Sequence, residues 1–265
     1  MAKETGVTGQ SSRVLWSGVF AFAFVITVVS PCPAQEPPTF ELEEPIVIQQ
    51  DLFTEEAGLA INTEAPEVLF TTIDPENFFG FEDPVTGEIA SSILVGTFYN
   101  PVTMEPITDV FPILGNPMGG FETHDLRYNP VSDQYIVVTK ADGRGNLGAN
   151  IPLIALVNPS SVAAENRIAK AFAYEEDSEQ DFDDVAVGVS TNNGNFLLVA
   201  ERDFPGEGEG VIGALFDQEG NLLTPNFGKL DQIQPEGDED DPDVDFLANN
   251  DVFLFQVNTD DSLYQ

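Results

Sequence analysis

The sequence predicts an all-β protein built from repeated four-stranded units. Three dipeptides recur at a step of 59 residues: Asp125-Leu126, Asp184-Val185 and Asp243-Val244. Each is followed ten to twelve residues later by an aromatic-led apolar run: Tyr135–Val138, Phe196–Val199 and Phe253–Phe255. Helical periodicity is almost absent, and 19 prolines and 22 glycines punctuate the chain. A fixed period indicates one structural unit copied along the chain.

The copy from 184 to 242 shows the expected elements most clearly. Residues 184–189 alternate apolar and polar or small, as in a half-buried strand, and Asn193-Gly194 then predicts a tight hairpin turn. Residues 196–200 form a continuous apolar run, which is typical of a strand covered on both faces. A third strand is predicted at 210–217 and a weaker fourth one within 222–233, where Pro225 interrupts the pattern.

The same pattern predicts the elements of the two earlier copies. In the copy from 125 to 183 the strands fall near 125–129, 134–139, 151–157 and 168–174, with a helical turn within 160–170. In the copy from 66 to 124 they fall at 67–73, 77–81, 92–99 and 105–114.

Four strands per repeated unit are typical of a β-propeller blade. The units resemble a repeat of secreted bacterial β-propeller proteins, in which an Asp-led opening, an aromatic-led run, a Gly-containing strand and an Asp-x-x-Gly turn follow one another. The matching residues are Asp184-Val185-Ala186-Val187, Phe196-Leu197-Leu198-Val199, Ile212-Gly213-Ala214-Leu215 and Asp217-Gln218-Glu219-Gly220. The resemblance covers roughly residues 66–257. It implies a propeller-like fold and supplies no catalytic residues.

The repeat count predicts how the two ends of the chain are used. Three copies are complete (66–124, 125–183 and 184–242), and the tail 243–265 supplies only two strands. The head, 35–65, contains the apolar segments Ile46–Ile48 and Leu59–Ile61, so head and tail together would form a composite fourth blade and close a four-bladed ring. Two alternatives remain open: a fragment of a larger propeller, and a pair of immunoglobulin-like sandwiches.

Residues 1–34 have the order of a secretory signal peptide. Lys3 and Arg13 precede an apolar run from Val14 to Val29, and small residues follow up to a cleavage point after Ala34. A retained membrane anchor is disfavoured because the run is shorter than the ~20 residues of a spanning helix. Lipid attachment at Cys32 is disfavoured by Pro31 before it. We expect a single domain, 35–265, secreted or periplasmic and without cysteine.

The charge of the chain is extremely negative, with 46 acidic and 9 basic residues. The basic residues beyond the leader all lie between Arg127 and Lys229. Such a surface repels nucleic acid and anionic lipid, so both are excluded as partners. It favours cations, cationic partners or plain solubility in salty surroundings. The ligand we expect is a protein or a glycan bound on one face of the ring.

Three aspartates are candidates for a central channel. Asp125, Asp184 and Asp243 occupy one position of the 59-residue repeat, at the start of the expected innermost strand. In a ring they would form a circle of carboxylates able to bind a cation or pair with backbone amides. The alternative is that each caps the loop into its unit, since Asp is a common turn residue.

The densest acidic cluster predicts calcium as a candidate ligand, because calcium favours several carboxylate oxygens on a flexible loop. The candidate ligands are Asp238, Asp240, Asp241, Asp243 and Asp245. An EF-hand is excluded, because Phe246 and Val252 stand where that loop needs Gly and Glu. A second acidic run, 175–181, lies at the equivalent place of the preceding copy. The alternative is a solvated acidic linker.

Catalytic machinery is sparse. His124 is the single histidine and is expected to be structural, since no nucleophile–base set accompanies it. The favoured function is a non-enzymatic exported binding or scaffold module. The alternative is a carboxylate-dependent glycan-active enzyme in the channel, which would need a pair of acids at glycosidase spacing.

Overall fold

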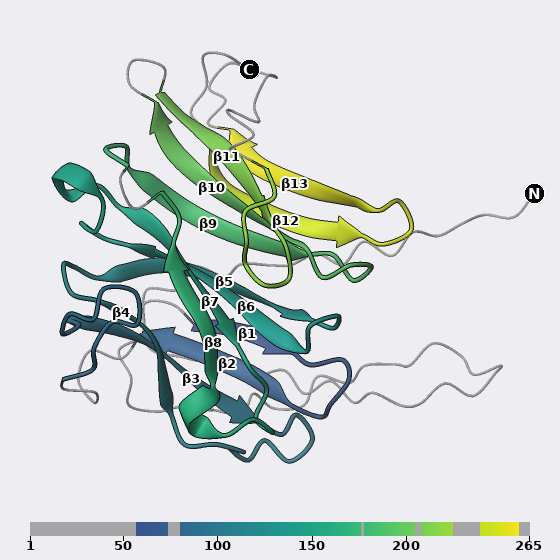
Figure 1. The fold of residues 1–265 in the computed structure, drawn as a ribbon. Coiled ribbons are helices and arrows are strands. Elements are labelled where there is room, and N and C mark those ends of the chain that lie inside the picture. The colour runs from purple at the N-terminus through teal and green to yellow at the C-terminus, as the bar shows by residue number, and fades with distance from the viewer. Residues whose placement is uncertain (1–56, 74–79, 176–177, 205–207, 225–238, 260–265) are drawn as a thin grey trace, which may run out of the picture.

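The computed structural model describes residues 57–73, 80–175, 178–204, 208–224 and 239–259. This part of the chain is all-β, which confirms the predicted class (Figure 1). Its strands form four antiparallel sheets, and its helical content is two single turns, η1 (Asn146–Gly148) and η2 (Ala164–Asn166). The second turn lies inside the segment predicted to be helical.

The first two sheets are four-stranded meanders. Sheet 1 consists of β1 (Ala57–Ile61), β2 (Val68–Ile73), β3 (Ser92–Tyr99) and β4 (Phe111–Asn116). Sheet 2 consists of β5 (Phe121–Asn129), β6 (Gln134–Ala141), β7 (Ile151–Val157) and β8 (Ile168–Ala173). The uninterrupted apolar run of β7 is buried along its whole length, as expected for a central strand packed on both faces.

The last two sheets have fewer strands among the described residues. Sheet 3 consists of β9 (Phe182–Val189), β10 (Phe196–Phe204) and β11 (Gly208–Phe216). A single bridge from Phe216 to Leu222 is all that is described of its predicted fourth strand, 222–233. Sheet 4 consists of β12 (Glu239–Leu247) and β13 (Val252–Thr259).

The first hairpin of each sheet has the same six-residue turn. The turns begin at Asn62, Asn129, Ser190 and Leu247. The side-chain oxygen of each of the first three accepts the backbone N–H two residues on. The fifth residue of the last three turns has positive φ: Asp133 (52°), Gly194 (76°) and Asp251 (53°).

These turns define which residues are equivalent between sheets. The step from sheet 2 to sheet 3 is 61 residues, and the step from sheet 3 to sheet 4 is 57. The 59-residue step of the sequence is therefore their mean. Asp125 and Asp243 are equivalent, but the position equivalent to them in β9 is Ala186, two residues after Asp184.

The sheets follow one another in a row joined along their first strands. β1 contacts β5, β5 contacts β9, and β9 contacts β12, and Figure 1 shows sheets 1 and 4 at opposite ends of the row. Two glycines permit the close approach of these strands. A Cβ on Gly58 of β1 would lie within 3 Å of side-chain atoms of Leu126, Thr71 and His124, and one on Gly188 of β9 would lie 2.9 Å from Val244.

The boundaries differ from the sequence prediction at the head of the chain. Sheet 1 begins at Ala57 rather than at 66, and Leu59–Ile61 pairs with β2 instead of joining the tail in a composite sheet. The described residues form no closed ring. The predicted leader 1–34, the segment 35–56 and most of the strand predicted at 77–81 lie outside the described residues.

Replacing Gly58 with valine tests the strand-to-strand packing. We expect Gly58→Val to lower the free energy of unfolding by about 1–3 kcal/mol, because the new side chain overpacks the junction of β1 with β5. Urea denaturation measures this. Ala57→Val, at an exposed position of the same strand, is the matched control and should change little. Equal effects of the two substitutions would contradict the close approach.

Candidate functional site

The candidate site lies where the first strands of sheets 2, 3 and 4 come together. Asp125 and Arg127 project from one face of β5, because successive side chains of a strand alternate. Asp243 is the equivalent of Asp125 on β12. We call Asp125, Arg127 and Asp243 the central cluster.

The carboxylate of Asp125 is held by three donors, while its side chain is only 15% exposed. Oδ1 accepts the backbone N–H of Leu126 at 2.8 Å and Nη1 of Arg127 at 2.7 Å. Oδ2 accepts the backbone N–H of Val187 in β9 at 3.0 Å. One side chain therefore fastens β5 to the first strand of the next sheet.

The backbone N–H groups that donate to these carboxylates occupy equivalent positions in the three sheets. Leu126, Val187 and Val244 occupy the same position on β5, β9 and β12, and within the described residues each of these strands pairs with another strand on one side only. Asp243 Oδ1 accepts the N–H of Val244 at 2.9 Å, as Asp125 does for Leu126. Since β9 has Ala186 at this position, Asp125 also serves the amide of β9.

Arg127 connects sheets that are not neighbours. Its Nη1 bonds to Asp125 at 2.7 Å, and its Nη2 lies 3.5 Å from Oδ1 of Asp243 across the intervening β9. The Arg127 and Asp243 side chains are 36% and 44% exposed, so solvent weakens this second contact.

Burial dominates the electrostatics of Asp125. Loss of solvation raises the pKa of Asp125 above its usual value, and the nearby charge of Asp243 adds to this effect. Arg127 and the amides of Val187 and Leu126 oppose the rise without cancelling it. The central cluster links β5, β9 and β12. Its hydrogen bonds go mainly to backbone amides and to its own members, so they stabilise the fold.

The structure brings together two of the three predicted channel aspartates. Asp125 and Asp243 are joined through Arg127, whereas Asp184 lies in an irregularity of β9, where Asp183 and Asp184 stand opposite Glu201 alone. That these side chains face a channel stays a prediction. Arg127 was missed from the sequence, although an Arg two residues after an Asp on one strand face is the signal that could have found it.

The predicted calcium ligands fall into two groups. Asp238 and the side chains of Asp240 and Asp241 lie outside the described part of the chain. Asp243 faces Arg127, and Oδ1 of Asp245 accepts the N–H of Phe246 at 2.8 Å. Among the side chains that the structure describes, no group of three or more His, Cys, Asp or Glu could hold a metal ion. Calcium binding stays a prediction.

The second acidic run and the histidine have local contacts. Glu175 pairs with Arg202 at 3.1 Å, and Asp181 accepts the N–H of Asn150 at 2.7 Å, while residues 176–177 are outside the described part. His124 lies against β1, since a Cβ on Gly58 would be 2.8 Å from its Nε2.

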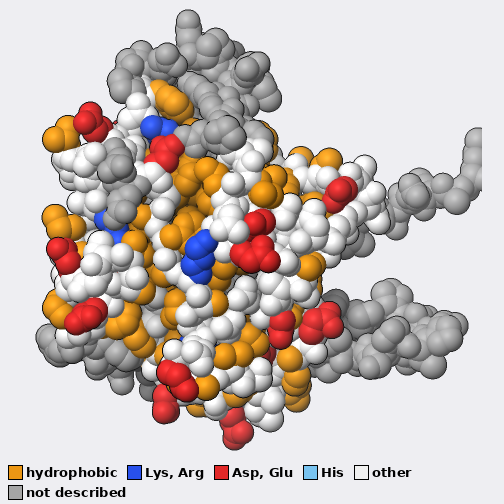
Figure 2. Space-filling model, viewed as in Figure 1, with side chains coloured by type: hydrophobic (Ala, Val, Ile, Leu, Met, Phe, Trp, Pro, Cys, Tyr) orange, Lys and Arg blue, Asp and Glu red, His pale blue; other side chains and the backbone are white. Residues whose placement is uncertain are grey.

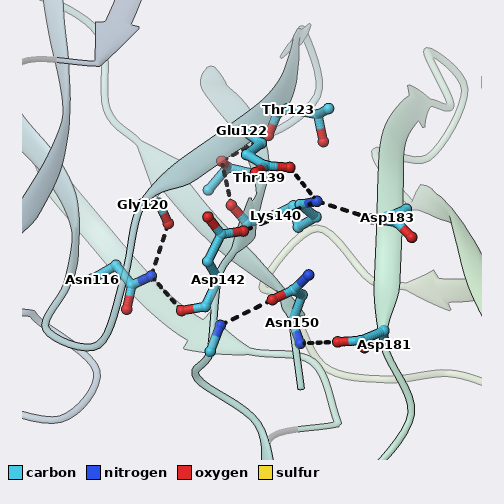
Figure 3. A network of polar contacts seen from close by, with 11 residues as sticks. Asn116, Gly120, Glu122, Thr123, Thr139, Lys140, Asp142, Asn150, Asp181 and Asp183 are labelled. Atoms are coloured by element: carbon cyan, nitrogen blue, oxygen red, sulfur yellow. Dashed lines mark hydrogen bonds and ion pairs between the residues drawn. The ribbon is translucent and has the colours of Figure 1, made fainter. Parts of the chain in front are cut away.

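A second polar cluster, not predicted from the sequence, surrounds Lys140 (Figure 3). The Lys140 side chain is 6% exposed, and its Nζ donates to Glu122 of β5 at 2.5 Å and to Asp183 of β9 at 2.9 Å. Burial by itself would lower the pKa of Lys140, but the hydrogen bonds to these two carboxylates outweigh burial and raise it. The ammonium group therefore stays charged and links sheets 2 and 3.

Neighbouring polar groups in Figure 3 extend this link to sheet 1. Nδ2 of Asn116, at the end of β4, donates to the carbonyl oxygens of Gly120 and Asp142 at 2.8 and 2.9 Å. Oδ1 of Asn150 accepts the N–H of Gly143 at 3.0 Å, and the N–H of Asn150 donates to Asp181.

Every basic residue that the structure describes contacts a group from another sheet or its loops. Arg144 forms a buried ion pair with Asp83 at 2.8 Å, and Arg202 pairs with Glu175. Arg167 lies over the rings of Phe98 and Phe111, and Lys170 donates to the carbonyl of Gly220 at 2.7 Å. Arg127 and Lys140 also contact other sheets, so each basic side chain that the structure describes links one sheet to another.

The surface between the outer strands of sheets 2 and 3 holds an open groove of about 420 Å³. Phe172, Tyr174, Phe216 and Leu222 line it together with Glu175. In the face shown in Figure 2, acidic side chains are widely spread and Lys and Arg occur at few places.

Comparison of the chain with protein-family models, with curated proteins and with solved structures found no significant match. Within the described residues, none of the helical segments is long and apolar enough to cross a membrane.

The titration of Asp125 gives a testable pH dependence. Because burial raises its pKa in the fold, Asp125 contributes stability that is present below its unfolded pKa of ~3.9 and is lost as pH rises through the folded pKa. We expect the free energy of unfolding of the wild type, minus that of Asp125→Asn, to fall as pH rises from about 4 to about 7, by no more than ~1.4 kcal/mol per pH unit.

Urea denaturation of both proteins across that range measures the difference, and the subtraction removes the repulsion among the other carboxylates. A difference that is constant or rises with pH would show that Asp125 is not destabilised as an anion.

Proposed function

We propose that this chain is a β-propeller-like array that acts as an exported, non-enzymatic binding or scaffold module. The observation that carries the arrangement is the contact of Arg127 on β5 with Asp243 on β12. Sheets 2 and 4 are separated by sheet 3, so this contact requires their first strands to curve around a common line. A flat stack of sheets would hold these side chains apart.

The repeated hairpin supports the same arrangement. Equivalent turns also interlock from sheet to sheet: Asn129 donates to the carbonyl of Gly194 at 2.8 Å, and Asn192 donates to that of Ala248 at 3.2 Å. Repetition of one junction around a line is the geometry of a propeller. Such an array is either a closed ring of four sheets or part of a larger propeller.

The state of the polar groups favours binding over catalysis. Asp125 uses both carboxylate oxygens on backbone amides and Arg127, and Lys140 is enclosed by Glu122 and Asp183. These groups stabilise the fold and are not directed at a substrate. The surplus of acidic side chains suits a cationic partner, and the leader-like residues 1–34 support export.

One observation favours the second candidate, a glycan-active enzyme. Asp125 has a raised pKa and shares Arg127 with Asp243, and a protonated acid near a second carboxyl group is the pair that glycosidases use. The three hydrogen bonds that hold Asp125 make it the weaker candidate.

Binding and hydrolysis can be separated with one protein preparation. We expect the full-length chain to be retarded in affinity gels that contain a polysaccharide, or to be retained by an immobilised cationic protein such as cytochrome c. We expect it to release no p-nitrophenol from a panel of p-nitrophenyl glycosides. Asp125→Asn is the matched variant. Release by the wild type that is lost in Asp125→Asn would establish the enzyme and contradict the module.

A further inference from the structure

The face of sheet 1 that points away from sheet 2 is largely apolar. Alternation along the strands places Ala60, Leu69 and Phe98 in the core shared with sheet 2. The apolar side chains on the opposite side include Leu59, Ile61, Val68, Phe70 and Val95, which we call the outer face, and Thr72, Thr97 and Tyr99 lie beside them as cross-strand partners.

Much of this outer face is buried although it lies at the end of the row. Val68, Phe70 and Val95 are 7%, 8% and 1% exposed. None of the three belongs to either hydrophobic cluster that the described residues form. The ring of Tyr99 lies edge-on to Phe70 on this face, and the core between the sheets does not account for the remaining burial.

The other end of the row shows how an uncovered face differs. Leu254 of β13 is 59% exposed, whereas its equivalents in the three preceding sheets, Leu69, Ile136 and Leu197, are at most 7% exposed because the next sheet covers them. If the outer face of sheet 1 were uncovered, its side chains would resemble Leu254. Only Leu59 and Ile61, on β1 at the margin, approach that exposure, at 45% and 40%.

We propose that residues 35–56 of this chain dock on the outer face of sheet 1. This segment leads directly into β1, the strand that carries Leu59 and Ile61, so it is tethered beside the face. It contains the apolar run Ile46-Val47-Ile48, which suits an apolar sheet surface. Its 22 residues, at up to ~3.3 Å per residue, are long enough to reach across the face.

Two other occupants are weaker. Residues 74–79 number only six and are fixed at both ends by β2 and Gly80, which limits their reach. A second copy of the chain would have to overcome the repulsion between two strongly negative molecules, while a tethered segment has a high effective concentration.

Photo-crosslinking in the full-length chain tests the docking directly. With p-benzoyl-phenylalanine in place of Leu59, we expect irradiation to link this position to residues 35–56 within one molecule, as identified by mass spectrometry of peptides. The same group in place of Val102, which is 78% exposed in the loop after β3, is the matched control and should not capture that segment. Capture of 74–79, capture of a second molecule, or no capture of 35–56 would overturn the proposal.

A second measurement tests the apolar run itself. Ile46→Asp with Ile48→Asp should expose the outer face and raise the fluorescence of bound 1-anilinonaphthalene-8-sulfonate at least about twofold. Gln49→Asp with Gln50→Asp adds the same charge next to the run and should leave the fluorescence unchanged. Equal fluorescence of the two double variants would overturn the proposal. The fluorescence test is independent of whether the protein is a binding module or an enzyme.

Discussion

The arrangement of the sheets depends on the carboxylate of Asp125. A first strand that pairs on one side only leaves backbone amides without a strand partner, and such groups are costly when water is excluded from them. Asp125 satisfies one of these amides on its own strand and one on β9. The same side chain thus satisfies one amide at each of two strand edges and holds the two sheets together. The charge of Arg127 offsets part of the cost of burying it.

The other cations extend this principle to the rest of the molecule. The chain has 46 acidic and 9 basic residues, so most of its carboxylates have no basic partner. Lys140, Arg144 and Arg202 each pair with an acid from a different sheet or its loops, and Lys140 also pairs with Glu122 of its own sheet. Buried ion pairs contribute less to stability than to the choice of one geometry, because removing the charges from water offsets the attraction. We infer that these pairs set the order and spacing of sheets whose apolar faces would otherwise pack in several ways.

The sequence contained most of the fold and only part of the site. Period-2 patterns and turn residues predicted the strands of sheet 2 nearly as they are, since local propensity decides them. The repeat step failed in β9, because aligning Asp184 with Asp125 assumed equal spacing, whereas the hairpin turns lie 61 and 57 residues apart, so Ala186 and not Asp184 is equivalent to Asp125. The pairing of Leu59–Ile61 with β2 was missed because a short apolar segment fits any sheet edge equally well. The contacts of Arg127 and Lys140 join residues 43 to 116 positions apart, which no local pattern encodes.

Hydrogen exchange at the amide of Val187 tests the role of Asp125 most directly. In the wild type this amide should exchange as slowly as the amides of the ladder between β9 and β10, although it is on the side of β9 that pairs with no other strand that the structure describes. In Asp125→Ala it should exchange much faster, while amides of the β10–β11 ladder stay protected and show that the sheet is intact. A Val187 amide that exchanges rapidly in the wild type, or that stays equally protected in Asp125→Ala, would contradict the claim that this carboxylate joins the sheets.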